Sequence, residues 1–128
     1  MRVVINNEYT HKLLGCAYEV HSALGPGLLE SVYEAALCYE LQSQGFEVRH
    51  QVPVKVDYKG VELDIDLRLD IIVDDSVILE LKSVSEIQPV HIKQSLTYMR
   101  LTDIKLGYVI NFNECSLKDG IERVVNRL

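Results

Sequence analysis

The residues with the clearest chemical potential lie in one hairpin, between Asp70 and Lys82. Its turn must fall near Asp74-Asp75-Ser76, because a three-residue loop pairs apolar residues on both faces and sets Asp70 opposite Glu80. Opposed residues bring their Cβ atoms to about 4.5 to 5.5 Å, and two carboxylates that close repel unless a proton or a cation separates them. The spacing therefore indicates a divalent cation at Asp70 and Glu80.

Two basic residues are predicted on the same surface as the acids. Side chains alternate along a strand, so Glu80 and Lys82 point to one face, where Arg68 lies across from Lys82 in this register. Mg²⁺ prefers carboxylate and carbonyl oxygens and keeps several waters, which leaves room for a phosphate and an attacking hydroxide. Lys82 would then orient that water or offset charge in the transition state.

A simpler interpretation is that Asp70 and Glu80 are solvated residues of a half-exposed sheet, each paired with a base. A DX₉EXK pattern is short enough to arise by chance. The context favours a site, because the acids continue the most apolar runs of the chain, 71–73 and 77–79. An unpaired charge is costly there, which raises the odds of a function.

The elements that would position these residues follow from hydrophobic periodicity. Apolar residues at spacings of three and four predict helices over Asn7–Leu24, 28–44 and 89–101. Asn7 is the expected cap of the first helix, and the turn Gly25-Pro26-Gly27 follows it. Period-two or continuous apolar patterns, with a turn at Lys59-Gly60, predict strands at 52–56, 63–71, 77–79 and 106–110, while 121–128 is ambiguous. The expected order is ααβββαβ with a small tail.

Composition limits the class of protein. With 128 residues and 48% hydrophobic content, we expect one α/β domain over residues 1–128. The net charge of −6 argues against a general DNA-coating protein, so any nucleic acid must be bound locally. Neither a signal peptide nor an apolar span is recognisable, which predicts no membrane association and a cytoplasmic location. The three cysteines show no metal-binding spacing.

The chain resembles the small GxxExxY proteins, whose motif reads Gly27-Leu28-Leu29-Glu30-Ser31-Val32-Tyr33. The resemblance runs in order through nearly the whole chain, taking in Val20-His21, Leu24-Gly25-Pro26-Gly27, Asp70-Ile71-Ile72-Val73, Glu80-Leu81-Lys82, His91, Gln94, Tyr98 and Asn111-Phe112. That family is placed in the PD-(D/E)XK nuclease superfamily. The resemblance thus implies a restriction-endonuclease-like core, with a mixed central sheet flanked by helices.

The same resemblance implies roles for individual residues. Asp70 and Glu80 would be metal ligands with the Leu81 carbonyl, and Lys82 the catalytic lysine. Glu30 would be a helix acid that completes the metal shell. Gln94 and Tyr98 resemble a QxxxY element, and their spacing of four places them on one helix face. Leu69 stands where the superfamily name has proline before Asp70.

Several of these residues have structural alternatives. Glu30 lies in the first turn of a predicted helix, where an acid is favoured simply by the helix dipole. Tyr33 is better read as a packing residue with a hydrogen-bonded hydroxyl. His21 and His91 are second-rank candidates for phosphate contact, since a lone histidine is more often a surface or hydrogen-bonded residue.

Two functions follow, in different classes. The first is a Mg²⁺- or Mn²⁺-dependent hydrolase of phosphodiester bonds in DNA or RNA. The alternative is a catalytically idle module that keeps the nuclease fold and acts by binding nucleic acid or protein, since fold does not guarantee activity. An acidic adaptor without nucleic acid ranks third. A homodimer could supply the groove that one short chain lacks.

Overall fold

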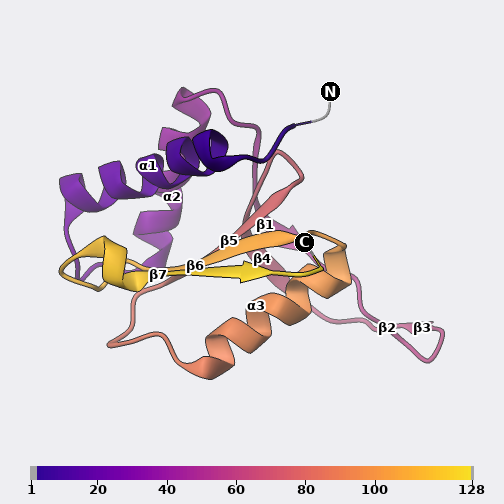
Figure 1. Cartoon of the computed structure of the whole chain (residues 1–128). Coiled ribbons are helices and arrows are strands. Elements are labelled where there is room, and N and C mark those ends of the chain that lie inside the picture. The colour runs from indigo at the N-terminus through magenta and orange to yellow at the C-terminus, as the bar shows by residue number, and fades with distance from the viewer. Residues whose placement is uncertain (1–2, 128) are drawn as a thin grey trace.

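A five-stranded mixed sheet forms the centre of the protein, whose computed structural model describes residues 3–127 (Figure 1). The strands lie side by side in the order β1 (Val48–Pro53), β4 (Arg68–Val73), β5 (Val77–Lys82), β6 (Leu106–Asn111) and β7 (Ile121–Val125). Only β5 and β6 run parallel, while the other neighbours are antiparallel. The predicted mixed α/β class is confirmed, and the ambiguous tail contains a strand.

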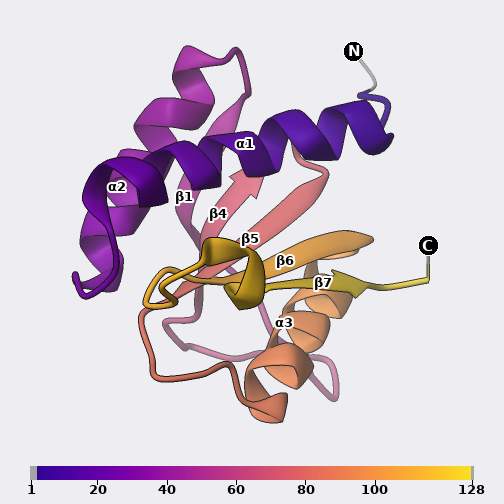
Figure 2. The ribbon, with the colours of Figure 1, turned by 60° about the vertical axis from the view of Figure 1, so that its left-hand side comes forward.

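Helices cover both faces of this sheet (Figure 2). α1 (Asn7–Leu24) and α2 (Glu30–Ser43) lie on one face, and α3 (Pro89–Thr102), which connects β5 to the parallel β6, lies on the other. A short 3₁₀ turn, η1 (Leu117–Gly120), precedes β7. Within residues 3–127 no helix is long and apolar enough to cross a membrane.

The two faces bury separate hydrophobic clusters. α1 and α2 pack on one side of the central strands, where Ile71, Leu79 and Leu81 are at most 1% exposed. α3 packs on the other side, where Met99 contacts a cluster that includes Ile72 and Ile78. Strands buried on both faces read as continuous apolar runs, which explains the sequence pattern at 71–73 and 77–79.

The β4–β5 hairpin has the predicted register. Val73 pairs with Val77, Ile72 with Ile78 and Ile71 with Leu79, around the three-residue loop 74–76. Asp74 and Asp75 adopt left-handed φ angles of 52° and 51°, a region that Asp tolerates better than most residues. The cap of α1 is a correction: Tyr9 N donates to Oδ1 of Asn6 at 2.8 Å, so Asn6, not Asn7, precedes the helix.

The strands predicted at 52–56 and 63–71 are wrong in part. β1 begins at Val48 and ends at Pro53, and residues 63–67 belong to no strand. Between them a two-stranded arm, β2 (Asp57–Tyr58) and β3 (Val61–Glu62), turns at Lys59-Gly60 and projects from the sheet (Figure 1). A bond from Ile65 N to Leu63 O closes a tight turn, which interrupts the strand that the alternation predicted.

Candidate active site

Asp70 lies where two strands part. The paired residues of β4 and β5 end at Ile71 and Leu79, one position before Asp70 would meet Glu80. In place of a further ladder bond, Oδ2 of Asp70 accepts the Leu81 N–H at 2.8 Å. The half-buried carboxylate is thereby fixed at the point where β4 and β5 diverge, with its second oxygen outside this bond. This arrangement accounts for the predicted proximity of Asp70 to Glu80.

Glu80 is a buried acid, 7% exposed, on the face that α3 covers. Its pKa is raised to about 8, mainly by burial and also by the negative charge of Asp70 and a hydrogen bond to that residue, against the lowering effect of Lys82. Oε1 of Glu80 has no hydrogen-bond partner in the part of the chain that the structure describes. At neutral pH the acid therefore holds a proton that a bound cation would displace.

The two predicted bases differ in their surroundings. Lys82 ends β5 half-buried, and its carbonyl accepts the Phe112 N–H at 3.0 Å, which fixes this strand end to β6. Arg68 is turned toward other partners: its Nε donates to Asp66 at 2.7 Å and its Nη1 to the Gln51 carbonyl at 3.5 Å. The paired residues of the hairpin stop short of Arg68 and Lys82.

α3 brings Tyr98 toward the acid pair. Its hydroxyl accepts a hydrogen bond from Nε2 of Gln94 at 2.8 Å, as the spacing of four allows. Partial burial raises the pKa of Tyr98, and the charges of Glu80 and Asp70 raise it too. His91 has a structural partner instead, because its Nδ1 accepts the Gln88 N–H at 2.9 Å and closes the capping box of the helix.

α2 presents two acids one turn apart. Glu30 is the first residue of the helix and is exposed. Glu34 is better enclosed, with a side chain 17% exposed, and it accepts a 2.6 Å hydrogen bond from Nε2 of Gln51. Burial raises the pKa of Glu34, and the charge of Asp70 acts in the same direction. Glu34 was not among the predicted site residues, although its spacing of four from Glu30 was a signal for it.

The glycine-rich turn and Tyr33 of the motif have structural roles. The Tyr33 hydroxyl donates to the Gly25 carbonyl and accepts the Leu28 N–H at 3.1 Å, and its ring stacks on Phe112. The prediction of a packing tyrosine is confirmed. His21 is held nearby, with Nε2 2.7 Å from the Glu114 carbonyl.

Asp70 and Glu80 fit a hydrated divalent cation. Among residues 3–127 no group of three or more His, Cys, Asp or Glu side chains is arranged to hold a metal ion. Mg²⁺ does not require such a group, because it is commonly bound through one or two carboxylates and keeps several waters. The unpartnered Oε1 of Glu80 beside a second carboxylate is the observation that supports this fit.

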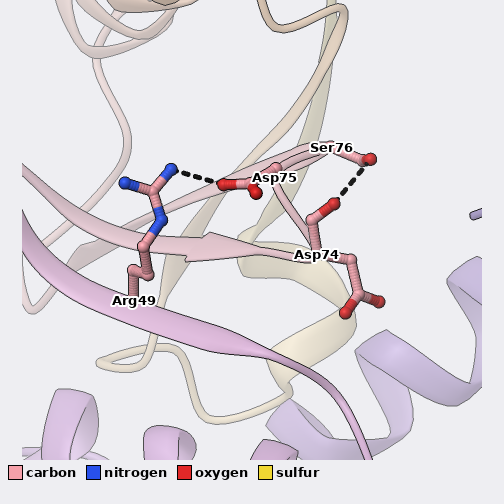
Figure 3. A network of polar contacts seen from close by, with 4 residues as sticks. All are labelled: Arg49, Asp74, Asp75 and Ser76. Atoms are coloured by element: carbon pink, nitrogen blue, oxygen red, sulfur yellow. Dashed lines mark hydrogen bonds and ion pairs between the residues drawn. The ribbon is translucent and has the colours of Figure 1, made fainter. Parts of the chain in front are cut away.

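A second polar cluster lies at the other end of the hairpin (Figure 3). Arg49 forms an ion pair with Asp75, and the Ser76 hydroxyl donates to the Asp74 carbonyl at 2.8 Å. A pocket of about 540 Å³ opens beside this turn and is lined in part by Lys105. Neither Asp70, Glu80 nor Lys82 lines this pocket, so it is not part of the acid site.

Comparison with known proteins gives one result. A family model for the PD-(D/E)XK nuclease superfamily matches residues 7–124, which takes in all five strands of the sheet up to Val124. No curated protein and no solved structure matches the chain significantly.

Proposed function

The chain belongs to the PD-(D/E)XK nuclease superfamily, and we propose that it is a divalent-metal-dependent nuclease that hydrolyses phosphodiester bonds in DNA or RNA. The observation that carries the proposal is the buried Glu80 beside Asp70, with one carboxylate oxygen unpartnered among the described residues. Membership of a nuclease superfamily favours a nucleic acid as the substrate.

In this proposal Asp70, Glu80 and the Leu81 carbonyl hold Mg²⁺ or Mn²⁺. Such a cation, when bound, polarises the phosphate and makes water a stronger nucleophile at neutral pH. Asp70 enters the reaction already positioned by the Leu81 N–H. Glu80, which is only 7% exposed, would give up its proton in order to hold the cation.

The remaining residues act on substrate. Lys82, two residues after Glu80 on the same strand, orients the attacking water or offsets the charge that develops on the phosphate. Gln94 and Tyr98 contact the phosphate or its neighbour from α3. His21, His91 and Arg68 are weaker candidates for substrate contact, because each has another partner in the protein.

Within the superfamily, we place the chain in the GxxExxY family on the motif that begins at Gly27. That placement adds Glu30 as an acid of the metal site. The predicted cytoplasmic location and homodimer stay predictions.

Titration of Mn²⁺ into the wild type and Glu80→Gln, followed by cleavage assays on the same samples, tests the proposal. The substitution keeps the size of the side chain and removes its charge. Glu122→Gln, at an exposed position of β7, is the matched control. We expect Glu80→Gln alone to lose both binding and cleavage. A pure wild type that cleaves neither DNA nor RNA with Mn²⁺ would contradict the nuclease and favour the idle binding module.

A further inference from the structure

Gln51 has an unusual backbone conformation beside the acid pair. It lies in the edge strand β1 with φ of 49°, a region that a residue with a side chain rarely adopts. The flanking pairs are His50 with Ile71 and Val52 with Leu69, so Gln51 occupies the position that faces Asp70. Conformations of this kind persist only where surrounding contacts hold them, and they cluster at functional sites.

Two contacts hold Gln51 in place. Its Nε2 donates to Oε1 of Glu34 on α2 at 2.6 Å, and its carbonyl accepts from Nη1 of Arg68 on β4. His50, the preceding residue, has its Nδ1 3.8 Å from Oε2 of Glu34. One oxygen of the Glu34 carboxylate is therefore hydrogen-bonded to β1 and the other lies near His50, so α2 is joined to the strand pair that carries Asp70.

Asp70 consequently has one acid, Glu34, on the side of α2 and another, Glu80, on the side of α3. α2 contacts β1, β4 and β5, and the charges of Glu34 and Asp70 influence each other. On the side of α3, Glu80 approaches Asp70 with an unpartnered buried oxygen. Glu30, one turn before Glu34, is exposed.

We infer that Glu34, oriented by Gln51, is a positioning acid of the metal site and that it contributes more to cation affinity than Glu30 does. The inference rests on the proposed metal-dependent function. Since the described residues contain no three-acid ligand group, Glu34 acts from outside the ligand shell. There its negative charge would favour a cation held by Asp70 and Glu80, and its oxygens would accept hydrogen bonds from the waters that a hard cation retains.

Titration of Mn²⁺ into Glu34→Gln, Glu30→Gln and the wild type tests the inference. Gln at position 34 still offers an oxygen to Gln51, so the variant keeps the contact between α2 and β1 and loses only the charge. We expect the dissociation constant of Glu34→Gln to rise about 10-fold or more, the range for lost outer-shell partners, and that of Glu30→Gln to rise less. Glu40→Gln, farther along the same helix, controls for net charge.

Melting in EDTA separates positioning from a structural role. A positioning acid leaves the melting temperature of Glu34→Gln unchanged or raises it, because the charge beside Asp70 is gone, whereas a structural role would lower it. Wild-type affinity in Glu34→Gln, or a larger loss in Glu30→Gln, would overturn the inference and leave the nuclease proposal intact. A wild type that binds no Mn²⁺ would overturn both.

Discussion

Glu80 combines burial with a neighbouring carboxylate, and both effects disfavour its ionised form. Its pKa rises from an ordinary 4.5 to about 8. Between these values the folded protein holds a proton that the unfolded chain has released, so stability falls as the pH rises. Below 4.5 both states are protonated, and above about 8 the loss is complete. A bound cation would reverse this effect by compensating the charge.

The pH dependence of unfolding in EDTA tests this assignment. We expect the free energy of unfolding of the wild type to fall, relative to Glu80→Gln, between pH 5 and pH 9, because the amide does not ionise. Urea unfolding of both proteins at one-unit pH steps measures the difference, in which the contributions of other titrating groups cancel. Parallel curves would show that Glu80 ionises normally and would remove the main support for the cation site.

The acid pair could be predicted from sequence because its geometry is local. Asp70 and Glu80 belong to one hairpin, whose apolar residues fix the loop length and the register. The contact between Glu34 and Gln51 joins a helix to a strand that follows it, and it depends on how the helix packs. The left-handed φ of Gln51 has no sign in the sequence either, since glutamine is not a residue that favours it.

The start of α1 depends on a single side chain. Asn6 accepts the Tyr9 N–H, which satisfies one of the free donors in the first turn. We expect Asn6→Ala to lower the free energy of unfolding by about 1 kcal/mol, as loss of such a cap does. Asn7→Ala is the matched control and should have little effect, because position 7 is already helical. Urea unfolding checks both, and the opposite ranking would restore Asn7 as the cap.

Most elements were predicted where a periodic pattern coincides with burial. The spacing of α1 and α3 gave their extents to within one residue, and the paired apolar runs gave β4 and β5. The segment that follows the arm is the exception: Leu63 and Ile65 alternate like strand residues but are 39% and 50% exposed. The alternation of apolar and polar residues is a local property, whereas strand pairing depends on a partner far along the sequence. The alternation therefore could not reveal where the chain leaves the sheet.

The two hydrophobic clusters share the same strands, so neither helical layer has a sheet of its own. Ile71 and Ile72 are successive residues of β4 that face opposite clusters. We propose that the chain is one cooperative domain, and we expect a single two-state transition in urea. Far-ultraviolet circular dichroism and the fluorescence of the seven tyrosines should give coincident midpoints, and no tryptophan complicates the signal. Separate midpoints would assign the helical layers to independent units.

The net negative charge of the chain limits how it can bind nucleic acid. With 13 Lys and Arg against 19 Asp and Glu, the chain has few cations with which to neutralise phosphates. Lys82→Gln, which we expect to bind without cleaving, should therefore show weak affinity for labelled DNA and RNA in EDTA and a marked gain in affinity with Mg²⁺.

Fluorescence anisotropy over a range of salt concentrations measures this affinity. A protein that neutralises Z phosphates gives a slope of about −0.9Z in log affinity against log salt, so a shallow slope is expected. Tight binding in EDTA with a steep slope would instead indicate a basic surface that recognises nucleic acid independently of Asp70 and Glu80.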